Sequence, residues 1–193
     1  MTHDPAPLEI TDLETLKALA HPRRQRILQH LGLHGPATSA GLARELGLNT
    51  GATSYHLREL GKHGLVEDVP ELARGRERWW RAPVRDLRVP PRSRQSEEMR
   101  AAVDELARLQ LADDLEQLAR FAEHRDELGE WGDAHLDSHG SIRLTRAELQ
   151  EFFEEYIRLL NRYKRPDEQT PEGARTVLTR MFTLPAMPIG EPE

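Results

Sequence analysis

The chain has 193 residues, of which 37% are hydrophobic and 31% are charged, so two small compact units are expected. It contains no cysteine, which excludes disulfides, thiolate metal sites and cysteine nucleophiles. No stretch approaches the roughly 18 apolar residues of a membrane span. The first ten residues lack the basic and apolar regions of a secretory signal, so a cytoplasmic protein without a membrane partner is expected.

The net charge of −6 hides an asymmetry along the chain. Residues 1–83 carry 11 Lys and Arg against 10 Asp and Glu, whereas residues 84–193 carry 16 against 23. A near-neutral front followed by an acidic back is typical of a nucleic-acid-binding part joined to a separate module. The net charge therefore does not exclude a DNA partner.

Four short helices are predicted in the first half of the chain. The first opens at Thr11–Glu14, which has the spacing of a capping box, and Pro22 suits the first turn of the second. The third spans 38–47, with a hydroxyl cap and a glycine stop, and the fourth spans 50–63. Two short strands joined by a charged, irregular loop are predicted to follow.

The second half contains two further predicted helices. Residues 84–96, rich in proline and arginine, are interpreted as a linker. A long helix is predicted over 97–128, and a capping box at Thr145–Glu148 opens another that runs to 163. Segments 131–144 and 175–184 are candidate strands, and residues 185–193 are predicted to form a loose tail.

The order of elements between Ala37 and Arg81 points to DNA. A helix, a tight turn, a second helix and a basic two-stranded loop place one helix in the major groove and a wing beside it. Four runs in this order closely resemble the winged helix-turn-helix domain of ArsR-like transcriptional regulators, over about residues 10–83: they are Ala20–Leu28, Leu42–Gly47, Thr53–Leu60 and His63–Val66. The resemblance implies a positioning helix, a recognition helix and the first wing strand.

The expected contacts with double-stranded DNA fall into two groups. Residues on one solvent face of helix 50–63 would meet base edges, with one histidine left between groove and packing. Hydroxyl and basic residues at the positioning helix and in the wing would meet phosphates, although any single arginine could equally be a solubilising charge. The first group is Thr50, Ser54, Tyr55, Arg58 and the ambiguous His56; the second is Ser39, Lys62, Arg74, Arg76 and Arg78, with Arg81 in the same cluster.

Metal sensing is weakly supported by this sequence. Members of the resembled family sense metals through cysteines or through histidine and carboxylate pairs, and this chain has no cysteine. His135, Asp137 and His139 could project from one face of a strand, but Gly140 and Ser141 favour an exposed turn there. No metal ligand and no cofactor are therefore assigned, and no small-molecule effector can be inferred.

Helix 97–128 has an apolar surface too long for its own small unit to cover, which predicts pairing with a second copy. The alternative is that helix 145–163 and the flanking candidate strands cover it within one chain, and the two arrangements are compatible. A phosphate loop, a nucleophile elbow and an HExxH pair are all missing, so no enzyme is expected.

The sequence thus predicts a mainly α fold with a small β-wing (α+β), in which a winged helix-turn-helix domain precedes a long helix and a small α+β C-terminal unit. The predicted parts are a DNA-binding domain over 10–83, a linker over 84–96, a dimerisation and effector domain over 97–184 and the tail. The expected function is that of a homodimeric transcriptional regulator, a repressor with activation left open. The alternative is a winged-helix protein adaptor that binds partners through its acidic C-terminal half.

Overall fold

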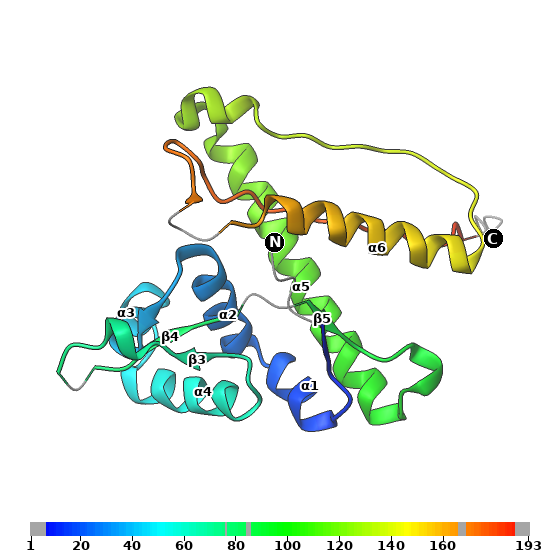
Figure 1. The fold of residues 1–193 in the computed structure, drawn as a ribbon. Coiled ribbons are helices and arrows are strands. Elements are labelled where there is room, and N and C mark those ends of the chain that lie inside the picture. The colour runs from blue at the N-terminus through cyan, green and yellow to red at the C-terminus, as the bar shows by residue number, and fades with distance from the viewer. Residues whose placement is uncertain (1–6, 76, 84–85, 166–168, 188–193) are drawn as a thin grey trace, which may run out of the picture. The chain divides into compact units, whose positions relative to one another are not determined.

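The computed structural model describes residues 7–75, 77–83, 86–165 and 169–187, and the chain divides into two compact units, 1–143 and 144–193 (Figure 1). The first unit holds the helices that the sequence predicts in the first half. Their bounds are Leu13–Leu19 for α1, Pro22–His34 for α2, Ser39–Glu45 for α3 and Thr50–Lys62 for α4.

The caps of these helices explain where they start. Asp12, and not the expected Thr11, caps α1, because its carboxylate accepts a hydrogen bond of 2.7 Å from the Thr15 amide. Thr38 caps α3 through a 3.0 Å bond from the Gly41 amide, which places Ser39 inside the helix. The α4 helix starts at the predicted Asn49-Thr50 step.

Three strands, one more than predicted, form the sheet of the wing. In the order β2-β4-β3, all antiparallel, they are Ala37–Thr38, Trp79–Arg81 and Glu67–Asp68. A short 3₁₀ turn, η1 (Pro70–Leu72), interrupts the loop between β3 and β4. The additional strand, β2, directly precedes α3, so the sheet is attached to the start of that helix.

The predicted linker carries regular structure within its described residues. There β5 (Leu87–Arg88) pairs in parallel with β1 (Leu8–Glu9), and η2 (Arg92–Arg94) leads into the next helix. The domain boundaries drawn from the sequence remain a prediction.

The core of the first unit lies among the four short helices. Leu16, Ile27, Leu42, Leu57 and Leu60 are fully buried there and belong to one hydrophobic cluster with Trp80 of the sheet. Truncating one such leucine to alanine costs about 2–5 kcal/mol, so each is a large fraction of a small domain's stability.

Helix α5 spans Glu97–His124 and packs against α1. It is shorter than the predicted 97–128, because the chain continues as the 3₁₀ segment η3 (Arg125–Asp133), in which Gly129 has a φ of 61°. Only the first part of α5 is covered: Leu106 is buried, whereas Leu111, Leu115 and Leu118 are 49%, 59% and 49% exposed.

The second unit contains α6 (Arg146–Tyr163), which opens with the predicted capping box of Thr145 and Glu148. The candidate strands at 131–144 and 175–184 are wrong, since both described segments lack the ladder hydrogen bonds of a strand. The predicted class, mainly helical with a small sheet in a winged-helix arrangement, is confirmed. Among the described helices, none is long and apolar enough to cross a membrane.

Candidate nucleic-acid interface

The α4 helix has one buried face and one open face. Thr53, Leu57 and Leu60 are fully buried against the core. Thr50 and Arg58 are exposed, and Tyr55 is 51% exposed, although aromatic side chains are usually drawn into a core. The face predicted to meet DNA is therefore the solvent face of this helix.

His56 does not lie on that open face. It is only 6% exposed, and its ring centroid lies 4.9 Å from that of His21 and 5.5 Å from that of Tyr55. Burial lowers the pKa of His56, and the charges of His21 and Arg24 lower it further. The prediction that His56 faces the bases is therefore wrong, because its ring packs against His21 at the start of α2.

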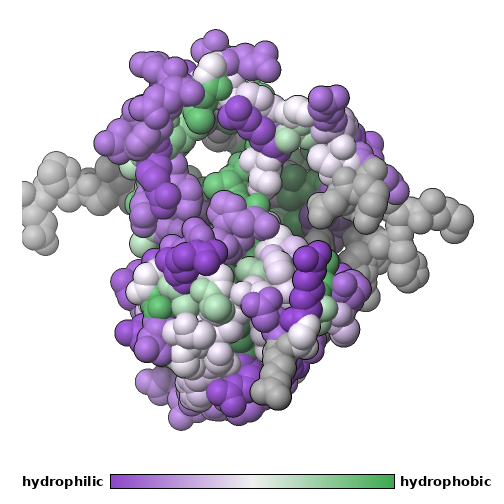
Figure 2. All heavy atoms as spheres, turned by 90° about the vertical axis from the view of Figure 1, so that its left-hand side faces the viewer, coloured by the Kyte–Doolittle hydropathy of each residue, from purple (hydrophilic) through white to green (hydrophobic). Residues whose placement is uncertain are grey.

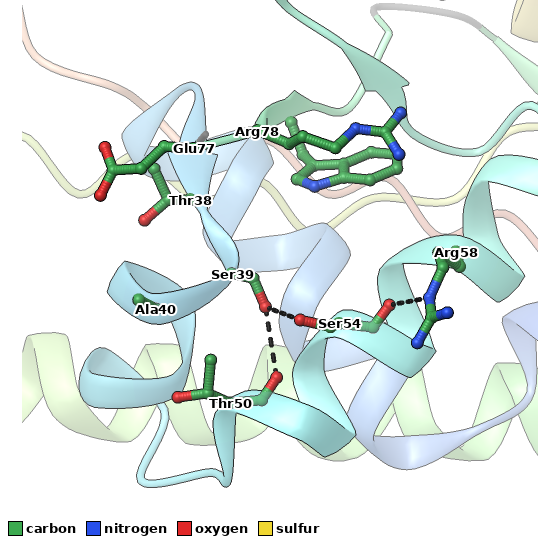
Figure 3. Close-up of a pocket in the computed structure, with 9 residues that line it drawn as sticks. Thr38, Ser39, Ala40, Thr50, Ser54, Arg58, Glu77 and Arg78 are labelled. Atoms are coloured by element: carbon green, nitrogen blue, oxygen red, sulfur yellow. Dashed lines mark hydrogen bonds between the residues drawn. The ribbon is translucent and has the colours of Figure 1, made fainter. Parts of the chain in front are cut away.

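Ser39 and Ser54 connect the two helices of the helix-turn-helix. Their hydroxyl oxygens lie 2.6 Å apart, and the Ser39 hydroxyl also lies 3.3 Å from the Thr50 carbonyl oxygen, to which it donates (Figure 3). Ser54 is half-buried, so it is less open than its neighbours on α4. Both hydroxyls therefore fix the angle between α3 and α4 in the free protein.

A shallow pocket of about 320 Å³ lies where α3, α4 and the wing meet. Figure 3 shows the serines of α3 and α4 on one side and Arg78 on the other. Arg58 lies at the α4 edge, where its Nε donates 3.1 Å to the Ser54 carbonyl oxygen. The pocket joins hydroxyls and two guanidinium groups with the Glu77 carboxylate, and its hydroxyl and guanidinium donors are suited to an oxyanion.

The described wing arginines differ in their partners. Arg78 donates through Nε and Nη2 to Asp68 at 3.1 and 2.9 Å, and its guanidinium lies 4.7 Å from the Trp80 ring centroid. Arg81 donates 2.6 Å to Glu67, which raises the pKa of Arg81. No sequence spacing signalled these carboxylate partners, since each lies on the neighbouring strand.

The remaining predicted phosphate contacts are exposed or unplaced. Arg74 is exposed in the wing loop, and Arg76 lies outside the described residues. Lys62 forms an ion pair with Glu59 one turn earlier on α4, and this hydrogen bond lowers the pKa of Glu59. The lower half of Figure 2, on the side where α3 and the wing lie, shows mainly hydrophilic and neutral side chains with small hydrophobic areas.

The candidate metal ligands do not converge. Within the described ranges, no group of three or more His, Cys, Asp or Glu side chains could hold an ion. His139 Nε2 lies 3.3 Å from Asp137 Oδ2, while the His135 ring lies 5.5 Å from the Phe121 ring. His135, Asp137 and His139 are all exposed, as in a polar surface segment.

Comparison with known proteins gives matches to part of the chain. Residues 19–69 match the model of a helix-turn-helix domain. The HTH-type transcriptional regulator YgaV of Escherichia coli (strain K12) is 43% identical over 60 residues, which are 31% of this chain and 60% of that protein. The match thus spans less than two thirds of the relative.

Solved structures give weaker likenesses. Reduced HlyU from Vibrio cholerae N16961 is 28% identical, with 50% of this chain and 85% of that chain covered and a TM-score of 0.32. A possible transcriptional regulatory protein from Mycobacterium bovis (fragment 1–100) is 25% identical, with 52% and 88% covered and a TM-score of 0.34. The sequence match and the structure coincide: residues 19–69, which match the helix-turn-helix domain, contain α2, α3, α4 and β3, and β4 lies just beyond them in the wing.

Proposed function

We propose that this chain is a sequence-specific DNA-binding transcriptional regulator of the ArsR-like kind, which acts as a homodimer and places α4 in the major groove. The observation that carries the proposal is the open face of α4, where Thr50, Tyr55 and Arg58 are exposed beside the wing. An exposed tyrosine, and an arginine without a carboxylate partner among the described residues, on a short, well-capped helix are explained by contact with bases.

The dimensions of DNA agree with this placement. The major groove is about 12 Å wide and admits one α-helix, whose side chains can then reach base edges. Arg58 has a guanidinium that can pair bidentately with guanine once its bond to the Ser54 carbonyl is exchanged. Arg74 and Arg78 of the wing would lie along the phosphate backbone, together with Ser39 and Lys62 as weaker contacts.

A second copy would cover α5. Leu111, Leu115 and Leu118 recur at helical spacing and stay exposed in one chain, so pairing of two α5 helices would bury them. Such a dimer presents two α4 helices to half-sites one helical turn apart. In this proposal residues 10–83 bind DNA, residues 97–184 assemble the dimer, and bound dimers repress by covering a promoter.

Capture of sheared genomic DNA by the full chain at moderate salt tests the proposal. The test variant is Tyr55→Ala/Arg58→Ala, and the matched control is Tyr163→Ala/Arg120→Ala, which removes the same residue types from exposed positions of α6 and α5. The fragments enriched by wild type and by the control should share a pseudo-palindrome. The test variant should not enrich fragments that carry it.

Two other results would contradict the proposal. Equal enrichment by wild type and the Tyr55→Ala/Arg58→Ala variant would mean that α4 does not read bases. Failure of the wild-type chain to retain DNA even at low salt, where phosphate contacts are strongest, would favour the adaptor that binds protein through its acidic C-terminal half.

A further inference from the structure

We infer that the N-terminus of α2 is a second site that binds a DNA phosphate, on the opposite flank of α4 from the wing. The residues that form it are His21, Arg23, Arg24 and the buried His56 of α4. The inference rests on the proposed function and adds to it a named anion site and a dependence of DNA binding on protons. This site shares no residue with the pocket that lies where α3, α4 and the wing meet.

The first observation is the charge at the start of α2. This 13-residue helix begins at Pro22, its N-cap residue His21 makes no side-chain capping bond, and its first turn holds arginines and no acidic residue. Basic groups at a helix N-terminus oppose the helix dipole, whereas a bound anion is favoured by both the dipole and the arginines. The basic residues therefore destabilise the start of α2 unless an anion is bound there.

The second observation is an unmet demand for hydrogen bonds. His56 is 6% exposed and its ring lies 4.9 Å from that of His21, toward the start of α2. Within the part of the chain that the structure describes, His56 Nδ1 and Arg24 Nε are both buried without a hydrogen-bond partner. Buried polar nitrogens rarely stay unpaired, so two of them beside a cationic helix start indicate an oxyanion that completes the site.

The third observation is position relative to the groove-facing side of α4. Ser54 and His56 are two residues apart, so they lie about 200° apart around the helix axis, with Tyr55 between them. Ser54 belongs to the pocket that the wing closes, and His56 contacts His21 on α2. A helix in the major groove is flanked by the backbones of both strands, so the wing would hold one strand and the α2 start the other.

Binding of a DNA phosphate at this site should be accompanied by uptake of protons by the histidines. In the free chain burial lowers the pKa of both His21 and His56, with the charges of Arg23 and Arg24 acting in the same direction. The acidic group that faces His56 is Glu59, which raises its pKa but is itself paired with Lys62. A phosphate against the rings favours their protonated form, so DNA binding should strengthen as the pH falls.

The experiment measures the affinity of the full chain for a captured DNA fragment, or for random duplex DNA if none is enriched, between pH 8 and 5.5 and across salt. The test variant is Arg23→Gln/Arg24→Gln, and the control is Arg92→Gln/Arg94→Gln, which removes two exposed arginines of η2. His21→Gln reports on the protons, and circular dichroism at each pH verifies that every variant stays folded.

We expect wild type to bind more tightly at lower pH, by up to about tenfold per pH unit for each proton taken up. The Arg23→Gln/Arg24→Gln variant should bind about tenfold more weakly, with a salt slope smaller by about one, and the control should match wild type. His21→Gln should bind with a flatter pH dependence. The ring-proton NMR signals of His56 should titrate at higher pH when DNA is bound.

Distinct results would overturn the inference. If wild type binds DNA but the Arg23→Gln/Arg24→Gln variant keeps its affinity, its salt slope and its pH dependence, α2 holds no phosphate while the proposed function stands. An unchanged titration of His56 on adding DNA leads to the same conclusion. If wild type binds no DNA at any pH and salt, the proposed function fails and the inference fails with it.

Discussion

The hydroxyl oxygens of Ser39 and Ser54 lie 2.6 Å apart, so one hydrogen bond joins the first turn of α3 to the middle of α4. The two residues are 15 positions apart in the chain and neither is fully exposed. A helix-turn-helix reads DNA only if its two helices keep a fixed angle, and this bond acts directly on that angle.

Replacing Ser39 with alanine is therefore expected to lower both stability and DNA affinity. Loss of one neutral hydrogen bond should reduce the free energy of unfolding by about 0.5–1.5 kcal/mol in urea titrations. Ser54→Ala should do the same, and the double variant should cost less than the sum, because the two side chains share the bond. Strict additivity would show that the bond does not form in solution, and Ser141→Ala in an exposed segment is the control.

Arg78→Gln should weaken DNA binding by a similar factor on all sequences and reduce the salt slope by about one, because a phosphate contact carries no sequence information. Its ion pair with Asp68 is exposed, so the loss of stability should stay below about 1 kcal/mol. Fluorescence anisotropy with specific and random duplexes measures both effects. A loss confined to the specific duplex would contradict the assignment, and Arg120→Gln is the control.

Stability should fall as the pH drops from about 7 toward 5. Burial lowers the pKa of His21, His30 and His56 in the folded chain, whereas in the unfolded chain they titrate near 6.5. Below that pH the unfolded chain binds more protons, so the free energy of unfolding decreases as the solution becomes more acidic. The window ends near pH 5, where carboxylates begin to titrate.

Urea midpoints at several pH values measure this dependence. His56→Gln should flatten it, since one buried imidazole is removed, while Leu136→Gln, which changes a 91% exposed side chain and no titratable group, should leave the slope as it is in wild type. A midpoint that stays constant between pH 7 and 5, or one that rises on acidification, would contradict the assignment of the pH effect to His21, His30 and His56.

The exposed leucines of α5 should decide the assembly state. Leu111→Ser/Leu115→Ser/Leu118→Ser is expected to turn a dimer into a folded monomer, because pairing of the helices is driven by burial of this apolar stripe. Analytical ultracentrifugation at micromolar concentration reads this directly. The control is Leu136→Ser, at a position that is 91% exposed. A wild-type monomer, or a dimer that survives the triple change, would place the assembly surface elsewhere.

The sequence by itself determined the features that depend on neighbours within one turn of helix. The starts and periods of the short helices, the capping box at Thr145 and the order of elements between Ala37 and Arg81 follow from local spacing, so the winged-helix class could be read directly. Local signals do have limits, since Asp12, and not the expected Thr11, caps α1.

The tertiary structure decided whatever depends on partners far along the chain. A strand exists only if another supplies its hydrogen bonds, so Ala37–Thr38 became a strand beside Trp79 and Trp80, while the candidates at 131–144 and 175–184 did not. The buried place of His56 is set by its packing against α2, and the Asp68 partner of Arg78 lies on a neighbouring strand. Such contacts join residues far apart in the sequence, which helical periodicity does not relate. The exposed face of α4 could therefore be predicted from the sequence, whereas the contacts on either side of it could not.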